Sequence, residues 1–548
     1  MIGVRRLIAA GVAAVFMGSI LVAGGGLPAQ AASSSKHIHI TCEYSRVCPD
    51  VNDQSNVFDE YTGHDEPSLL FYSDAPGSGN QFQSIVTIPR DPPPSHPLSR
   101  SYNFELNGTF WFGMALCDTQ SYPEQVSTCT PDSDSNIVDP ATSPNHPGQA
   151  FLELQFYPPG WVAWPTWAVA VGASTCDPTK WCAAMNVFSL LEDPVNGTLQ
   201  NDTCASRIGI ETFQFAFVTK SGRSHAPANP LDSTLATFTP DRTKDLFMSA
   251  GDRIRVRLHD TPDGVQAVLN DLTSGESGSM TASPANGFDQ FQYDPSGTSC
   301  VGIPYAFHPM YSTSSEATRV TWAAHTYNLA FSDEIGHFQY CSGAAVPATP
   351  FGLDHSGAPV SCPSGNTEEL GTNAEPTDED DNFCFPASEA LRFHVQGCTD
   401  TNAGFDGVSY QPVWPNGDTA NRPTPVQFTS FLTGSSYNQP YDRAAFEADL
   451  PAIERTTQGC NRSTGANCTL IPLTDEGVPA DFYPFFTTRS VGGVCNWQFG
   501  GNTPGDISNF GENNQYGSLL FSSYLAFGGG GTSVLRTNNY RGIIDNPC

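Results

Sequence analysis

The clearest pattern along the chain is a strict alternation of apolar and polar positions over residues 253–259. Ile, Val and Leu alternate there with three arginines and a histidine. A period of two residues predicts a β-strand with one buried face. The sequence TPDG at residues 261–264 predicts a tight turn, and the apolar positions over residues 265–269 predict the returning strand. Because the hairpin has one apolar face that a second sheet must cover, the pattern favours a β-sandwich.

Other stretches have the same strand-like character, and together they predict an all-β protein. They cover residues 69–72, 82–88, 101–117, 150–161, 211–218, 287–294 and 318–331. One segment of the second half, residues 440–454, predicts a short helix instead. Asp442 would be its N-cap, and Phe446, Leu450 and Ile453 would form its buried stripe.

The N-terminal residues 1–31 predict a secretory signal. Arg5 and Arg6 precede an apolar run, and Ala29-Gln30-Ala31 fits the small-x-small pattern of a cleavage site. No later apolar run is long enough to cross a bilayer, so we expect a secreted, extracellular protein without membrane insertion. After the signal, we expect a polar lead-in (32–64), a β-sandwich (65–342), a Pro/Gly-rich and acidic linker (343–382) and a smaller disulfide-rich β domain (383–548).

All 16 cysteines follow the predicted cleavage site, and none forms a tight CxxC pair. An even number of cysteines in an exported chain predicts disulfides rather than a zinc site. Pairing neighbours in sequence order gives Cys42–Cys48, Cys117–Cys129, Cys176–Cys182, Cys204–Cys300, Cys341–Cys362, Cys384–Cys398, Cys460–Cys468 and Cys495–Cys548.

The charge balance narrows the range of partners. There are 24 Lys and Arg against 56 Asp and Glu, so the net charge is −32, or −34 once Arg5 and Arg6 leave with the signal. Such a surface repels nucleic acid and anionic lipid, so we expect no nucleic-acid partner. It suits work at acidic pH, although the solubility of a secreted protein explains the same charge.

Candidate chemistry lies on the strand predicted near residue 153. Glu153 and Gln155 are two positions apart, so both side chains leave the same strand face, roughly 7 Å from each other. Cleavage of a glycosidic bond uses two carboxylates roughly 5–10 Å apart, and Asp289, Asp118 or Glu105 could supply the second. We take Glu153, Gln155 and Asp289 as the catalytic candidates. The alternative is that Glu153 and Gln155 are merely solvated.

Aromatic residues near this strand are the candidates for substrate binding, namely Trp111, Tyr157 and Trp161. The function that we expect is binding or hydrolysis of an extracellular polymer, preferably a glycan. The partner would therefore be an extracellular polysaccharide or protein substrate. A non-catalytic role at a surface, or a structural role, stays open.

A resemblance adds a further alternative. SAGDRIRVRLHDTPDGVQAVLNDLTSGESGSM, residues 249–280, resembles the hairpin of eqolisin-type glutamic peptidases, and LELQFYPP, residues 152–159, is similar to the aromatic-Tyr-Pro run of that family. The resemblance implies a lectin-like (concanavalin-like) sandwich and an acid-acting peptidase that uses one Gln and one Glu. FWFGMALCDTQ nominates Gln120 for the first role, and GFDQFQY offers Asp289 where the family has Glu.

Two motifs raise the question of metal binding. His308, His325, Glu334 and His337 fall within 30 residues, and DEIGHF is similar to the zinc-peptidase helix motif with Asp333 in place of its first His. The flanking residues read as strand, so we prefer structural histidines. The segment Cys398–Gly407 is similar to a calcium loop but has Gly404 where an acid or amide is required. We therefore expect no metal and no cofactor.

The polar side of the 253–259 strand is unusual in so acidic a chain. Arg253, Arg255 and Arg257 lie on one face with His259. They could bind the carboxylates of an acidic polymer. Such rows more often pair with acids on the neighbouring strand.

Overall fold

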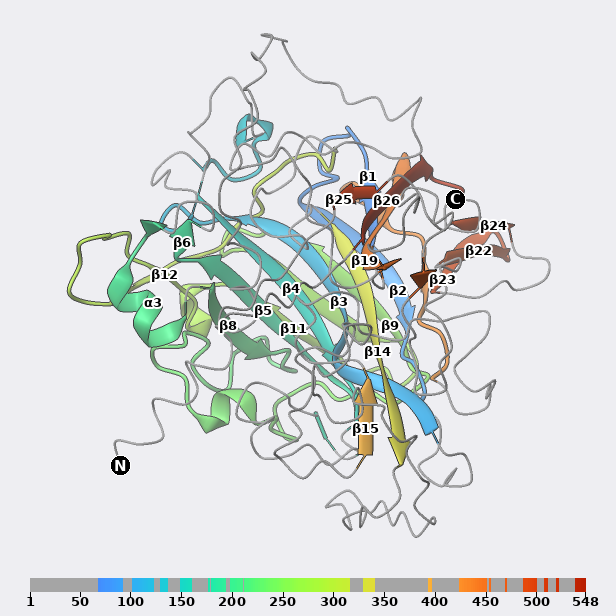
Figure 1. The fold of residues 1–548 in the computed structure, drawn as a ribbon, viewed down its shortest axis with the longest axis horizontal. Coiled ribbons are helices and arrows are strands. Elements are labelled where there is room, and N and C mark those ends of the chain that lie inside the picture. The colour runs from blue at the N-terminus through green and yellow to red at the C-terminus, as the bar shows by residue number, and fades with distance from the viewer. Residues whose placement is uncertain are drawn as a thin grey trace.

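The computed structural model describes most of the region from residue 68 to residue 315 and several segments beyond it. The described residues are 68–91, 101–122, 129–136, 148–159, 176–177, 179–193, 198–209, 211–315, 329–340, 393–396, 423–450, 453–454, 469–470, 486–499, 507–510, 519–521 and 538–548. Within them the protein is all-β, as the alternating patterns predicted (Figure 1).

Two large antiparallel sheets make up the fold. Sheet 1 has the order β25-β26-β19-β1-β14-β3-β4-β5-β8, and β15 adds to β14. Its strands are β1 (Ser68–Tyr72), β3 (Ser101–Cys117), β4 (Gln149–Tyr157), β5 (Cys182–Leu190), β8 (Glu211–Phe217), β14 (Ala330–Tyr340), β15 (Phe393–Gln396), β19 (Arg443–Leu450), β25 (Leu519–Phe521) and β26 (Asn538–Asp545).

Sheet 2 has the order β11-β10-β9-β2-β16-β23-β22-β24; β17 adds to β2, and β18 adds to β17. Its strands are β2 (Gln81–Thr87), β9 (Arg253–His259), β10 (Gln266–Asp271), β11 (Ser277–Thr281), β16 (Gln427–Thr429), β17 (Leu432–Thr433), β18 (Gln439–Pro440), β22 (Phe486–Val491), β23 (Val494–Phe499) and β24 (Ile507–Phe510). The predicted hairpin is confirmed as β9 and β10, with Leu258 opposite Ala267.

Shorter elements connect these strands. Helix α3 (Asp202–Ile208) and the 3₁₀ turns η4 (Asp134–Asn136), η5 (Leu235–Phe238) and η6 (Pro284–Asn286) lie in connections. Three two-stranded pairs complete the described elements: β6 (Glu192–Asp193) with β7 (Thr198–Leu199), β12 (Asp289–Phe291) with β13 (Gly302–Pro304), and β20 (Ile453–Glu454) with β21 (Thr469–Leu470). No helix among the described residues is long and apolar enough to span a membrane.

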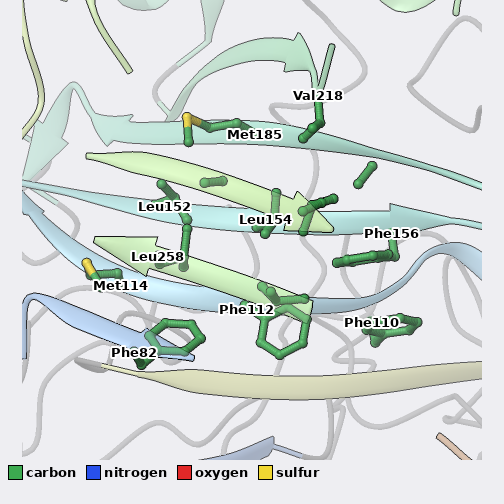
Figure 2. Close-up of a cluster of buried hydrophobic side chains, with 14 of the residues drawn as sticks. Phe82, Phe110, Phe112, Met114, Leu152, Leu154, Phe156, Met185, Val218 and Leu258 are labelled. Carbon is green, nitrogen blue, oxygen red and sulfur yellow. The ribbon is translucent and has the colours of Figure 1, made fainter. Parts of the chain in front are cut away.

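The two sheets pack face to face through the apolar half of each alternating pattern. Phe82 of sheet 2 lies 6.1 Å from Phe112 of sheet 1, measured between ring centroids. Figure 2 shows these rings with Leu154 and Leu258 in the same layer between the sheets. Burying large apolar side chains between two sheets is the main stabilising contribution to such a fold, roughly 1.5–3 kcal/mol for each fully buried side chain.

Strands from the C-terminal part of the chain extend both sheets. β19 pairs with β1 in sheet 1, and β16 pairs with β2 in sheet 2. Their side chains join the common core, where Phe428 and Trp497 lie 6.5 Å and 5.4 Å from Phe71 between ring centroids. The expected linker, residues 343–382, is outside the described residues, so the predicted domain boundary stays a prediction.

The predicted helix over residues 440–454 is wrong. Arg443–Leu450 is strand β19, and its backbone pairs with β1 on one side and β26 on the other. The sequence RAAFEADL suits a helix by composition, but hydrogen bonding to two neighbouring strands outweighs a weak local propensity.

Four of the eight predicted disulfides lie in the described residues, and all four are confirmed. They are Cys117–Cys129, Cys176–Cys182, Cys204–Cys300 and Cys495–Cys548. Within the described part of the chain no cysteine is free. The other four pairs involve cysteines outside it and stay predictions.

Candidate functional site

Strand β4 places Glu153, Gln155 and Tyr157 on the outer face of sheet 1, the face turned away from sheet 2. Their neighbours Leu154 and Phe156 point inward and belong to the core between the sheets. The sequence predicted this orientation, because successive side chains of a strand alternate between its two faces.

A chain of hydrogen bonds joins these residues. Gln155 Nε2 donates to Glu153 Oε2 at 2.5 Å, and the Tyr157 hydroxyl donates to Gln155 Oε1 at 2.5 Å. Asn186 of β5, which lies directly opposite Glu153, donates from Nδ2 to the Tyr157 hydroxyl at 3.2 Å. Burial raises the pKa of Tyr157, and the Glu153 charge raises it further, so this hydroxyl stays protonated and donates.

The site is buried. Glu153 is 5% exposed and Asn186 is fully buried, and Trp111, opposite Gln155 on β3, is 1% exposed. Glu153 is therefore not the solvated strand residue that the alternative interpretation assumed. The Oδ1 atom of Asn186 accepts no hydrogen bond within the described part of the protein. Buried polar atoms are nearly always paired, so this acceptor is an exception within the site.

Asp289 lies on the opposite side of sheet 1 from Glu153. Its backbone N–H and carbonyl each bond the Gln214 side chain at 2.9 Å. Gln214 is opposite Val187, which faces the core, so these contacts place Asp289 on the inner side of the sheet. Asn229 Nδ2 donates to the Asp289 carboxylate at 2.6 Å, while partial burial raises the pKa of that carboxyl group. The structure therefore does not bring Asp289 and Glu153 together.

Asp118 is also on the inner side, where it is nearly fully buried. Its carboxylate accepts hydrogen bonds from Ser189 Oγ at 2.7 Å, from Gln290 Nε2 at 2.9 Å and from the Gln120 N–H at 2.9 Å. Burial outweighs these donors and raises the pKa of Asp118 to about 6. Gln120 Oε1 in turn accepts the N–H of Tyr293 at 2.9 Å.

Three candidates of the sequence analysis thus gather around β12, away from Glu153. Asp289 is the first residue of β12. Asp118 accepts a hydrogen bond from Gln290 of β12, and Gln120 accepts one from Tyr293, two residues after the strand. Glu105 lies on β3, six residues before Trp111 of the Glu153 site. Glu105 and Trp111 are therefore roughly 20 Å apart along the strand. None of these acids stands beside Glu153. Trp161 lies outside the described residues, so its role stays a prediction.

The histidine set is not brought together. The carbonyl of His308 accepts the N–H of Cys117 at one end of β3, whereas His337 pairs with Asn103 near the other end. Fourteen strand residues separate these ends by about 45 Å. The DEIGHF motif is part of strand β14, not a helix. His325 and the segment Cys398–Gly407 lie outside the described residues, and no group of His, Cys, Asp or Glu within those residues is arranged to hold a metal ion.

His308 instead belongs to a small cluster at the end of the hairpin. Its Nδ1 lies 2.8 Å from Asp260 Oδ1, and this bond raises the pKa of the imidazole. The pKa of the nearby Asp132 carboxyl is raised to about 6, mainly by burial. The cluster supports the interpretation of His308 as a structural histidine.

Asn186 is the residue of the site that the sequence did not indicate. It comes from β5, about 30 residues after Glu153, inside the unremarkable run CAAMNVFSL. Only the register of β4 and β5 shows that it completes the hydrogen-bonded chain.

Comparison with known proteins identifies no relative. No family model matches the sequence, and no curated protein matches it. A search of solved structures finds the crystal structure of the enzymatically active domain of tailspike protein 2 from bacteriophage CBA120, at 9% identity and a TM-score of 0.15. The match covers 54% of this chain and 26% of that one, so this chain spans about a quarter of that protein's length. A likeness this low carries no argument about fold or function.

Proposed function

We propose that the protein is secreted and that it binds or hydrolyses an extracellular glycan at the outer face of sheet 1. The observation that carries the proposal is the hydrogen-bonded chain of Glu153, Gln155, Tyr157 and Asn186 beside Trp111. A carboxylate, amides and a hydroxyl beside an indole ring are the groups with which proteins bind sugar hydroxyls and ring faces.

Among these four hydrogen-bonded residues, Glu153 supplies the carboxylate that can transfer a proton. The Gln155 amide donates to it and holds one of its oxygens in place. A carboxylate of this kind can act as an acid or base toward a bound substrate or a water molecule. Asp118 and Asp289 face the other side of the sheet, so within the described residues Glu153 works with amide partners rather than with a second carboxylate.

A glutamic-type peptidase activity is the second candidate. The observation that favours it is the direct contact, at 2.5 Å, of one Glu and one Gln side chain. The family that the hairpin resembles uses this pair of residue types. The glutamine would then be Gln155 rather than Gln120, whose side-chain oxygen is bonded to the backbone of Tyr293.

The test compares the secreted wild-type protein with Glu153→Gln on a panel of neutral and acidic glycans and on casein, at about pH 3–4 and about pH 6. We expect Glu153→Gln to lower glycan hydrolysis by roughly 100-fold or more, because it removes the carboxylate that transfers the proton in this proposal. The fold should persist, since Gln at position 153 keeps an oxygen that accepts from Gln155. Glu276→Gln, at an exposed ion pair with Lys220, is the matched control.

Each outcome of this test either supports or contradicts a stated part of the proposal. Full glycan hydrolysis by Glu153→Gln contradicts the site, and a melting curve far below that of the control assigns Glu153 a structural role instead. Cleavage of casein alone would favour the peptidase. Binding to a glycan without any hydrolysis supports binding as the function, and inactivity and lack of binding on every substrate contradict the proposal.

A further inference from the structure

The outer face of sheet 2 has a row of arginines with no acidic residue opposite them on the neighbouring strands. Arg253, Arg255 and Arg257 point away from the core on β9, as the burial pattern of that strand shows. The residues opposite them on the two adjacent strands are uncharged: Thr87, Ile85 and Gln83 on β2, and Asn270 and Val268 on β10.

The expectation that this row pairs with acids on the neighbouring strand is therefore wrong. No ion pair involves any of the three arginines within the described part of the protein, although Asp and Glu outnumber Lys and Arg by 56 to 24 in the chain. We call Arg253, Arg255, Arg257 and His259 the arginine face. In so acidic a protein, three neighbouring positive charges without an acidic partner need an explanation beyond solubility.

One member of the arginine face is held in place. Arg257 Nε donates to Gln83 Oε1 at 2.7 Å, and its guanidinium carbon lies 5.0 Å from the centroid of the Tyr437 ring. Such contacts reduce the entropy that Arg257 loses when it binds an anion. Tyr437 also places an aromatic ring at the edge of the face, where a pyranose ring can pack against it.

We propose that the arginine face binds a carboxylate-bearing polysaccharide, a polymer of uronic acid residues. Alternate residues of a strand are about 7 Å apart, so the three guanidinium groups form a regular row that a repeating polyanion can contact several times. The planar guanidinium group matches a carboxylate through two parallel hydrogen bonds. The row is partly exposed, as are the uncharged residues beside it.

The negative net charge of the chain does not prevent this binding. At physiological ionic strength the screening length is about 8 Å, so acidic side chains beyond that distance contribute little at the arginine face. The nearest cross-strand positions are neutral. The arginine face is also separate from the Glu153 site, because the two lie on opposite outer faces of the sandwich.

The experiment measures the affinity of the folded protein for polygalacturonate by titration calorimetry. The test variant is Arg253→Gln/Arg255→Gln, which leaves the Arg257 contacts intact. We expect its affinity to fall about fivefold to thirtyfold, since each exposed ion pair contributes up to about 1 kcal/mol. The matched control is Arg207→Gln/Arg242→Gln, which changes the net charge equally at two exposed side chains outside sheet 2, one in α3 and one paired with Asp177, and should bind like the wild type.

Further binding measurements distinguish a carboxylate-specific site from nonspecific electrostatic attraction. Fully methyl-esterified polygalacturonate should bind poorly, and raising sodium chloride from about 0.05 to about 0.5 M should weaken binding of the acid form. Equal losses in the test and control variants, or equal binding of the methyl ester, would overturn the proposal. Tighter binding of polyphosphate than of polygalacturonate would also overturn it, because the site would then be a phosphate site.

One last variant tests whether polygalacturonate binds at the arginine face or at the Glu153 site of the proposed function. Glu153→Gln should bind polygalacturonate as the wild type does, whatever happens to its hydrolytic activity. Loss of binding in Glu153→Gln would place the polyuronate at sheet 1 and contradict the arginine face as its site.

Discussion

At the scale of single residues, two buried titratable groups favour the folded state in acid. Burial raises the pKa of Asp118 from 3.8 to about 6, so the folded protein binds this proton more tightly than the unfolded chain does. The bond to Asp245 raises the pKa of His225, and the Ala236 carbonyl accepts at the other ring nitrogen at 3.0 Å. Both contributions are present at low pH and are lost as pH rises through the pKa of the folded state.

Replacing Asp118 with Asn should therefore flatten the dependence of stability on pH. A difference of about two pH units between the folded and unfolded states corresponds to about 3 kcal/mol. From about pH 4 to about pH 7, the free energy of unfolding of the wild type should fall by about that much more than the free energy of the variant. Urea denaturation across this range measures both. Parallel curves for the two proteins would show that Asp118 is ionised in the folded protein at pH 4.

At the scale of elements, disulfides fasten long connections to the sheets. Cys204–Cys300 joins helix α3 to the residues before β13, across a sequence separation of 96. The helix is short, and Asn201 caps it by accepting the N–H of Cys204 at 2.9 Å. Cys176–Cys182 closes a separation of only 6 residues. Because a disulfide acts mainly by restricting the unfolded chain, the longer loop should stabilise the protein more.

Replacing both cysteines of each disulfide with serine tests this difference in stabilisation. Cys204→Ser/Cys300→Ser should lower the free energy of unfolding by about 4–5 kcal/mol, whereas Cys176→Ser/Cys182→Ser should lower it by about 2 kcal/mol. Chemical denaturation under oxidising conditions gives both values. A larger loss for the shorter loop would mean that local packing around the cysteines, and not chain entropy, sets their contribution.

At the scale of the whole molecule, strands from both ends of the sequence build one core. Phe71 comes from the first described strand, and Phe431 packs against it at 4.5 Å between ring centroids. Phe428 and Trp497 stack at 6.3 Å in the same cluster. These C-terminal aromatic residues therefore depend on the sandwich for their burial.

Truncating a C-terminal core residue should therefore destabilise the whole protein. We expect Phe428→Ala to lower the free energy of unfolding by about 3–5 kcal/mol and to shift a single calorimetric transition. Val491→Ala, at a side chain that is 55% exposed, is the control and should change little. Two separate transitions, of which only one moves, would instead favour the independent C-terminal domain predicted over residues 383–548.

The sequence by itself determined the properties that depend on near neighbours along the chain. Alternation with a period of two identified the β9–β10 hairpin and the outward direction of Glu153, because side-chain direction in a strand depends only on position. Neighbouring cysteines in the described region paired in sequence order, since short loops close at the lowest entropic cost. The all-β class followed from the same local patterns.

Only the tertiary structure decided which residues meet. Strand register placed Asn186 opposite Glu153, and it put Asp289 on the other side of the sheet. It also left the arginine face among neutral neighbours, where sequence statistics favour acids. Pairing with β1 and β26 made a strand of residues 443–450, which read locally as a helix. These outcomes depend on hydrogen bonds and burial between segments far apart in the chain, and a local pattern contains no information about them.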